Sequence, residues 1–320
     1  MSTWRNRAAA LVAMTLLTGA CANQGDDGSR FSIVVTSTVW GDVVENIVGD
    51  DAAVEVLFPA GVDPHEYQAS SQQIATLNQA DLVVANGLGL EAGLVSVLEA
   101  AESDGVNVFE VAALLDPLPL GGSEASGECD PDQAQDHGAE VDHSGGCDPH
   151  VWMDPGRVAD ASRLLADELT RIDATVDWRT RADDYAAELL AADEEIGALL
   201  GTVPVENRRL VTNHDTLGYL ADRYGYEVIG TVMPGGSTLS DPSSEDLARL
   251  VDVIRQAGVN VVFAETIEPA ALAEAVAAEV GETVQVIELH TDSLGEAGTG
   301  ADSLIGLLMT NAESIAAALR

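Results

Sequence analysis

The chain has 320 residues, and its Asp and Glu residues outnumber its Lys and Arg residues by 54 to 14, which leaves a formal net charge of −40. A surface this acidic repels phosphate backbones, so the composition excludes nucleic-acid binding as a function. The acidity also attracts cations weakly, but its role in keeping an exported protein soluble is enough to account for it.

The first residues have the layout of a bacterial export signal. Arg5 and Arg7 precede an apolar run that, at about ten residues, is too short to span a bilayer. Small residues then lead to Cys21 in a pattern that resembles a lipobox, so we expect residues 1–20 to be a lipoprotein signal peptide and Cys21 to carry the lipid. Ordinary cleavage that leaves a free cysteine is the alternative. The polar, Gly-rich residues 21–30 are typical of a flexible tether, and the body after them has no membrane-length apolar run.

From residue 31 onward, short β-branched runs alternate with amphipathic segments. The alternation indicates βαβ units on a mostly parallel sheet and predicts an N-terminal lobe at 31–155. In this lobe, strands are expected at 31–36, 53–57, 81–85 and 106–109, and helices at 39–48, 71–79 and 90–101.

Two long amphipathic segments follow, at 158–172 and 176–200, and predict connecting helices over 156–203. A helix of about 25 residues reaches about 37 Å, so one long rigid helix would join two lobes and limit their relative motion. The second half repeats the alternation and predicts a C-terminal lobe at 204–320. The strands of this lobe are expected at 209–213, 226–229, 260–264 and 284–289, and its helices at 217–224, 244–257, 270–280 and 304–319. The predicted fold class is therefore α/β, with a mostly parallel sheet flanked by helices in each lobe.

Residues 121–146 interrupt this pattern. They lack periodicity and are rich in Gly, Ser, Asp and Glu, which predicts an irregular acidic loop. Two cysteines, Cys129 and Cys147, lie 18 residues apart, and in an oxidising extracytoplasmic setting they favour a disulfide that contributes on the order of 3 kcal/mol. A thiolate metal site that includes His137 and His143 is the competing interpretation.

The triplet Asp-Pro-His ends at His65 and again at His150, and a third histidine, His214, closes a predicted strand. The three are too far apart in the chain for a local zinc finger, so an ion that they share must lie where two halves of the fold meet. In sheets of this type, ligands bind outside the carboxyl ends of strands, where His65, His214 and Asp292 are expected. Three imidazoles and one carboxylate fill a tetrahedral shell with no place for a reactive water, which favours binding over catalysis.

Each of these residues has a simpler alternative role. His65 and His150 lie beside prolines and could cap turns, whereas His214 and Asp292 could cap the helices that follow them. His290 is a spare ligand candidate, because strand alternation would turn it to the same side as Asp292.

Three carboxylates could support such a site by contacting its ligands. Glu66 and Asp215 adjoin the histidines, and Glu265 ends a predicted strand, so any of them could orient an imidazole N–H group. Solvent-exposed loop acids are the alternative interpretation. The main rival from another class is a zinc-dependent hydrolase with an open coordination site, but the chain has no His-Glu-x-x-His pair.

The sequence around these residues resembles, in the same order, the successive signatures of the zinc and manganese (ZnuA-like, cluster A-I) solute-binding proteins of ABC transporters. The matching segments are 61–70, 148–155, 213–220 and 292–295. The resemblance covers nearly all of the mature chain. It implies two α/β lobes joined by one long helix and a metal in the cleft, and by position it implies that His65, His150, His214 and Asp292 are the ligands.

The resemblance also bears on the metal and the partners. Manganese members commonly have a glutamate where this chain has His214, which favours zinc and leaves manganese or iron as alternatives. The implied partners are the permease and ATPase of an ABC importer. We expect a monomer without enzymatic activity, anchored to the outer face of the cell membrane. Zinc-type members tend to carry a histidine-rich insert, but residues 121–146 hold two histidines, His137 and His143, so low-affinity zinc capture there is a hypothesis beside a solvated acidic loop.

Overall fold

The computed structural model describes residues 31–121, 129, 146–281 and 283–320. The predicted signal peptide, the tether and Cys21 lie outside these residues, as do His137, His143 and most of the predicted acidic loop. Within the ranges described, no helix combines the length and the apolar character needed to cross a membrane.

The N-terminal lobe is built on a parallel sheet with the strand order β2-β1-β3-β4. The sheet forms because its strands are rich in Val and Ile, which suit a pleated surface covered on both faces. Its strands are β1 (Phe31–Val35), β2 (Ala52–Val56), β3 (Leu82–Ala85) and β4 (Val108–Glu110). The connecting helices are α1 (Thr38–Val48), α2 (Ser71–Leu77) and α3 (Val95–Ser103), with short 3-10 turns η1 (Gly49–Asp51) and η2 (Ala112–Leu114).

Helix α3 begins later than its sequence pattern predicts. The pattern predicts a start near residue 90, whereas the helix begins at Val95. The preceding residues form turns in which Leu88 adopts a positive φ of 54°. The Glu91 carboxylate accepts hydrogen bonds from the backbone N–H groups of Asn86 and Gly87, at 2.7 and 3.2 Å, which stabilises the turns in place of a first helical turn.

The C-terminal lobe repeats the same topology, with the parallel order β6-β5-β7-β8. Its strands are β5 (Arg209–Thr212), β6 (Glu227–Thr231), β7 (Val261–Glu265) and β8 (Gln285–Leu289). Its helices are α7 (Gly218–Tyr224), α8 (Ser244–Ala257), α9 (Ala271–Val280) and α10 (Leu304–Leu319), and a 3-10 turn η5 (Val205–Asn207) precedes β5.

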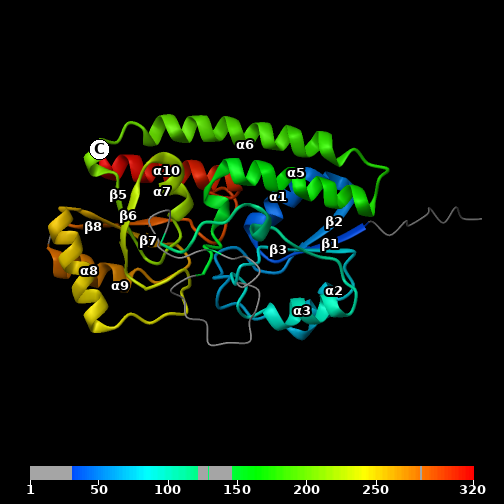
Figure 1. Cartoon of the computed structure of the whole chain (residues 1–320), viewed down its shortest axis with the longest axis horizontal. Coiled ribbons are helices and arrows are strands. Elements are labelled where there is room, and N and C mark those ends of the chain that lie inside the picture. Colours follow the sequence, from blue (N-terminus) through cyan, green and yellow to red (C-terminus); the bar gives the residue numbers. More distant parts are fainter. Residues whose placement is uncertain (1–30, 122–128, 130–145, 282) are drawn as a thin grey trace, which may run out of the picture. The chain divides into compact units, whose positions relative to one another are not determined.

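Two helices connect the lobes. After the 3-10 turn η4 (Val151–Met153), the side chain of Asp154 caps the first turn of α5 (Pro155–Ile172). Helix α6 (Trp178–Leu200) then runs back along α5 (Figure 1). Helix α6 packs against α1 of the first lobe and α10 of the second, so one 23-residue helix contacts both lobes. The predicted connection by one long helix is thus realised by α6, with α5 packed on it.

The hydrophobic core also links the lobes. One buried cluster runs through α1, α5, α6 and α10 and includes residues of both sheets, such as Val35 and Phe263. Two smaller clusters fill the opposite faces, one beneath α2 and α3 and the other beneath α8 and α9. Because the largest cluster is shared, separating the lobes would disturb packed apolar side chains.

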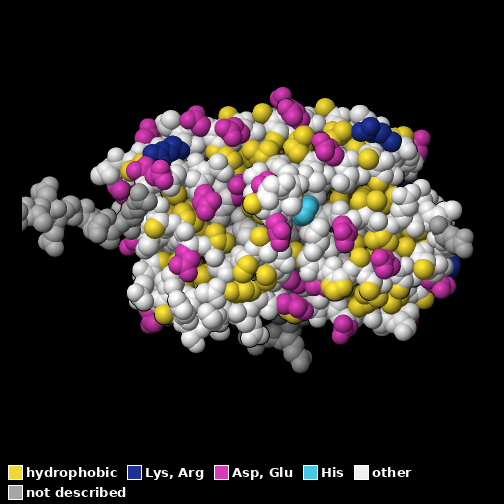
Figure 2. All heavy atoms as spheres, turned by 180° about the vertical axis from the view of Figure 1, so that it is seen from behind, with side chains coloured by type: hydrophobic (Ala, Val, Ile, Leu, Met, Phe, Trp, Pro, Cys, Tyr) yellow, Lys and Arg dark blue, Asp and Glu magenta, His cyan; other side chains and the backbone are white. Residues whose placement is uncertain are grey.

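The charges on the outer surface reflect the acidic composition of the chain. Acidic side chains are scattered over the face drawn in Figure 2, and Lys and Arg are few on it. The two parallel sheets confirm the predicted α/β fold class with two lobes.

Candidate metal centre

Four side chains from separate segments meet in the interior between the two sheets. His65, His150, His214 and Asp292 each offer a ligand atom, and these atoms all lie within 4.8 Å of one another. None of the four side chains is more than 2% exposed. The structure thus brings together the whole set that the sequence predicted.

The spacing of the four donors matches the size of a small coordination sphere. Nε2 of His214 lies 3.3 Å from Nε2 of His150 and 3.4 Å from Oδ2 of Asp292. Oxygens of Asp292 lie 3.7 Å from Nε2 of His65 and from Nε2 of His150. Two ligands bound at 2.0–2.1 Å to a tetrahedral ion stand about 3.3 Å apart, so small movements would complete a zinc shell.

The fold places these residues through its strand ends. His65 follows β2, His214 follows β5 and Asp292 follows β8, so all three project from the carboxyl edges of the parallel sheets. Such edges are the usual ligand-binding side of doubly wound sheets. His150 immediately precedes η4, where the chain leaves the first lobe for α5.

Carboxylates orient two of the three imidazoles. Oδ1 of Asp148 lies 2.7 Å from Nδ1 of His150 and accepts a hydrogen bond from its backbone N–H at 2.9 Å. Oε1 of Glu265 holds His214 in the same way, at 2.7 Å from Nδ1 and 3.0 Å from the backbone nitrogen. Because Nδ1 is engaged in both rings, Nε2 of each ring is free to face the centre.

Several polar atoms in the centre are buried without a hydrogen bond. Among the residues that the structure describes, both ring nitrogens of His65 and both carboxylate oxygens of Asp292 lack a hydrogen-bond partner. A buried polar group left in this state costs about 1–3 kcal/mol. A divalent cation would satisfy one atom of each residue and offset the carboxylate charge, so the donor set fits a metal ion.

The electrostatics of the centre also favour a cation. Burial lowers the pKa of His65 to about 3, so this imidazole is neutral at physiological pH. Burial also acts to lower the pKa of His214, but Glu265 and Asp292 outweigh it and hold that pKa well above the ordinary value. The pKa of His150 is raised despite burial, through Asp292 and Asp148. The carboxylates therefore attract positive charge into the centre, and protons and metal ions compete for it.

Asp292 is the shared partner of the histidines. Burial alone would raise its pKa, but the charges of His150 and His214 outweigh that effect and bring the pKa down to about 2. The carboxylate is therefore ionised at any pH at which the protein would bind a metal, and it supplies the negative donor of the set.

The predicted supporting residues occupy different places. Glu265 contacts His214 as described, and its second oxygen accepts a hydrogen bond from Thr291 at 2.7 Å. Asp215 instead accepts a hydrogen bond from the backbone of Gly121 at 2.7 Å. Glu66 is exposed and belongs to a separate acidic group with Asp63 and Glu268.

His290 lies outside the four-residue group. Strand β8 ends at Leu289, so the alternation that was expected to direct His290 and Asp292 to one side does not continue past the strand. Nδ1 of His290 lies 3.3 Å from the Thr266 hydroxyl, and its backbone N–H donates to Asn311 at 3.0 Å.

Sequence reasoning missed the role of Asp148. The repeated Asp-Pro-His triplet was the available sequence signal. Both triplets form the same turn, in which the backbone N–H of His65 donates to Asp63 at 2.8 Å, as that of His150 does to Asp148. The contact with the imidazole ring is found in the second triplet, and the sequence pattern alone does not distinguish the two.

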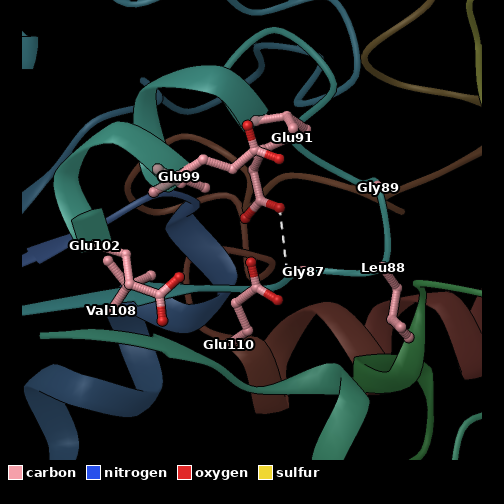
Figure 3. Close-up of a pocket in the computed structure, with 10 residues that line it drawn as sticks. Gly87, Leu88, Gly89, Glu91, Glu99, Glu102, Val108 and Glu110 are labelled. Carbon is pink, nitrogen blue, oxygen red and sulfur yellow. Dashed lines mark hydrogen bonds between the residues drawn. The ribbon is translucent and has the colours of Figure 1, made fainter. Parts of the chain in front are cut away.

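A polar network of the first lobe supports the second triplet. The Asn86 side chain donates to the carbonyl of Pro149 at 3.0 Å and accepts from the Trp40 indole at 2.8 Å. Glu91 in turn holds the Asn86 backbone, and the pocket beside it is acidic (Figure 3). Glutamates that line this pocket are Glu91, Glu99, Glu102 and Glu110. Buried Glu91 therefore fixes the backbone of Asn86, directly after β3. The Asn86 side chain in turn holds Pro149, the residue before His150.

Hydrogen bonds join the two lobes on both sides of the centre. The Ser293 hydroxyl accepts a hydrogen bond from the Gly61 backbone at 2.8 Å, and Thr238 donates to Asp63 at 2.5 Å. The Trp152 indole donates to the Thr291 carbonyl at 2.9 Å. These bonds join segments of the two lobes next to the ligands, and Trp152 packs edge-on against His150, at 5.4 Å between ring centroids.

The two cysteines are joined. Cys129 and Cys147 form a disulfide, which favours that interpretation over a thiolate metal site. Cys147 is buried and its backbone pairs with Pro119, so the disulfide joins the chain at a fixed position directly before Asp148.

A buried set of three imidazoles and one carboxylate, enclosed between two α/β lobes that share a rigid helix, defines a metal-binding protein of the two-lobed solute-binding class. The profile of the ZnuA family, described as "Zinc-uptake complex component A periplasmic", matches residues 33–318. The chain belongs to this family.

The relatives of the chain include proteins named for different metals. Zinc-binding protein TroA of Treponema pallidum is 30% identical over 323 residues, which cover 97% of both chains. Manganese-binding lipoprotein MntA of Bacillus subtilis is 30% identical over 321 residues, 98% of both chains. Iron-binding protein YfeA of Yersinia pestis is 29% identical over 320 residues, 97% of this chain and 95% of the relative.

The solved structure of TroA from Treponema pallidum has the same fold. Its TM-score is 0.76 at 30% identity, and the match covers 91% of this chain and 99% of TroA.

Proposed function

We propose that this protein captures zinc outside the cytoplasm and delivers it to the permease and ATPase of an ABC importer, with His65, His150, His214 and Asp292 as the zinc ligands. The observation that carries the proposal is the convergence of these four buried side chains within 4.8 Å, from four separate segments. Membership of a family described as the periplasmic component of a zinc-uptake complex supports the transport role.

Zinc is proposed over manganese and iron because of the donor atoms. Three imidazole nitrogens and one carboxylate suit zinc, whereas manganese prefers a larger share of oxygen ligands. The distances of 3.3 and 3.4 Å around His214 are close to a tetrahedral edge at zinc bond lengths. Relatives named for zinc, manganese and iron make metal choice the first property to measure.

The experiment is a metal analysis followed by a competition titration. Protein purified without chelator is analysed for bound metals, and metal-free protein is titrated with zinc and with manganese against a chromophoric chelator. We expect zinc in the purified protein and tighter zinc binding, with His65→Ala, His150→Ala and His214→Ala each losing most of it. His290→Ala is the control, because this histidine lies outside the group. Wild-type zinc affinity in any two of the three ligand variants would overturn the proposed site.

The same preparation tests the rival functions. A zinc-dependent hydrolase would turn over ester or peptide substrates when loaded, and a manganese carrier would bind manganese more tightly than zinc. Zinc-loaded protein without turnover supports the carrier, and sustained hydrolysis by the pure protein contradicts it.

We propose that the chain is held at the membrane through a lipid on Cys21, after removal of residues 1–20. The motif around Cys21 and the lipoprotein MntA among the relatives support this proposal. Mass spectrometry of the N-terminal peptide from the membrane fraction would detect the diacylglyceryl modification. A Cys21→Ser variant should lose it and leave the membrane fraction after cleavage, and an unmodified wild-type peptide would refute the anchor.

The acidic segment with His137 and His143 is proposed to capture zinc weakly before transfer. The test is a deletion of residues 130–145, which leaves both cysteines in place, with zinc affinity and the rate of zinc loading measured on the intact and shortened proteins. Slower loading at an unchanged final affinity supports the proposal, and unchanged loading removes it.

Light scattering on the metal-free and loaded forms tests the expected monomer.

A further inference from the structure

A tyrosine of the second lobe holds the residue that orients His150. Tyr219, on α7, is 1% exposed, and its hydroxyl donates a hydrogen bond to the backbone carbonyl of Asp148 at 2.7 Å. The same hydroxyl accepts a hydrogen bond from the backbone N–H of Leu118 at 3.0 Å. One buried hydroxyl thus joins the first turn of α7 to two segments of the first lobe.

The residue before the tyrosine touches the side chain of the same aspartate. A Cβ atom built on Gly218 would lie 2.7 Å from Oδ2 of Asp148, closer than a real Cβ atom approaches an oxygen. Glycine at this position therefore lets the Asp148 carboxylate rest directly on the helix backbone. The first turn of α7 contacts both the carbonyl and the carboxylate of Asp148.

Asp148 transmits this contact to the metal centre. Its other carboxylate oxygen engages both the backbone nitrogen and Nδ1 of His150, which directs Nε2 of that ring to within 3.3 Å of Nε2 of His214. His214 lies in the loop that leads from β5 into α7. The segment that supplies one histidine therefore also positions the other.

We propose that Tyr219 is a positioning residue for metal binding: it holds Asp148 from across the lobe interface and so keeps His150 at coordination distance from His214. This inference rests on the proposed role of the two histidines as zinc ligands.

The test compares two tyrosine-to-phenylalanine variants. Tyr219→Phe removes the hydroxyl and keeps the ring. Tyr226→Phe is the matched control, because the Tyr226 hydroxyl also donates to a backbone carbonyl, that of Leu200 at 3.0 Å, and the residue is 8% exposed. If Tyr219 acted through general stability alone, both variants would melt somewhat lower and bind zinc as the wild type does.

Two readouts separate positioning from stability. Zinc affinity by chelator competition should fall about tenfold or more in Tyr219→Phe, the effect expected when an outer partner of a metal-bound histidine is lost, and stay within twofold in Tyr226→Phe. The visible absorption of cobalt-loaded protein, which reports ligand geometry, should change in Tyr219→Phe and not in the control. Tyr219→Phe with wild-type zinc affinity and an unchanged cobalt spectrum would overturn the proposal, as would an equal loss in both variants.

A double-mutant cycle tests the route through Asp148. If Tyr219 acts through Asp148, the losses of affinity in Tyr219→Phe and Asp148→Asn should not add in the double variant, whereas full additivity contradicts the route. Should Tyr219→Phe not fold, Gly218→Ala presses on the Asp148 carboxylate from the same turn and must then lower zinc affinity. Failure of the wild type to bind zinc would refute the proposed function, whereas zinc binding that is insensitive to these variants refutes this inference alone.

Discussion

The contact between Glu265 and His214 allows a sharp test of how the buried carboxylates tune the centre. Glu265 is 1% exposed and makes three contacts, with the backbone nitrogen and Nδ1 of His214 and with the Thr291 hydroxyl. In Glu265→Gln, the amide oxygen can keep both contacts with His214 and the amide nitrogen can donate to Thr291. The substitution therefore removes the charge while preserving the hydrogen bonds.

The expected loss of zinc affinity is about 10- to 100-fold, or about 1.4–2.7 kcal/mol, because a neutral partner leaves the imidazole a weaker ligand. A second effect opposes the first. The charge of Glu265 helps to raise the pKa of His214 in the metal-free protein, so the variant also releases a competing proton more readily. The difference in affinity should therefore grow as the pH rises and shrink as the pH falls, because the competing proton is held more firmly by the wild type than by the variant.

The assay is a chelator competition titration of zinc at pH 6, 7 and 8 on the wild type, Glu265→Gln and a charge-matched control. Glu288→Gln removes an equal charge from an exposed position on β8 and should bind zinc like the wild type. Glu265→Gln binding within threefold of the wild type at pH 8 would refute the reasoning. A difference that grows as the pH falls would refute the account of proton competition.

Three further predictions follow from the same site and its surroundings. The pKa values of His150 and His214 lie above the ordinary 6.5 in the metal-free protein, so protons compete with zinc already above that pH. Between pH 7 and 5, the logarithm of the zinc affinity should therefore fall by more than one unit per pH unit. An affinity that does not change with pH would contradict this. His65→Ala should weaken zinc binding by more than about 100-fold, because it removes a ligand rather than its orienting partner, and calorimetry would show this directly. Replacing Cys129 and Cys147 by serine should lower the free energy of unfolding by on the order of 3 kcal/mol, measured in denaturant without reductant; an unaffected midpoint would show that the disulfide does not stabilise the fold.

The secondary structure was predictable because its signals are local. The strand-like runs correspond to the eight strands described, and the predicted helix at 244–257 matches α8 residue for residue. The late start of α3 is an exception, because buried Glu91 holds the turns before it and also accepts a hydrogen bond from the hydroxyl of the distant Thr36 at 2.7 Å. A carboxylate that stabilises a turn leaves no periodic trace in the sequence.

The sequence by itself determined the α/β class, the repeated βαβ pattern and the residues that emerge at the strand ends, since side-chain period and strand direction follow from local patterning. On those grounds it singled out His65, His214 and Asp292, and the repeated Asp-Pro-His triplet added His150. Tertiary structure decided which groups meet. It assigned the support of His150 to Asp148, turned His290 away beyond the end of β8 and brought Tyr219 across the lobe interface. Side-chain direction in irregular segments depends on contacts with residues far away in the chain, and those contacts exist only once both lobes have folded around α6.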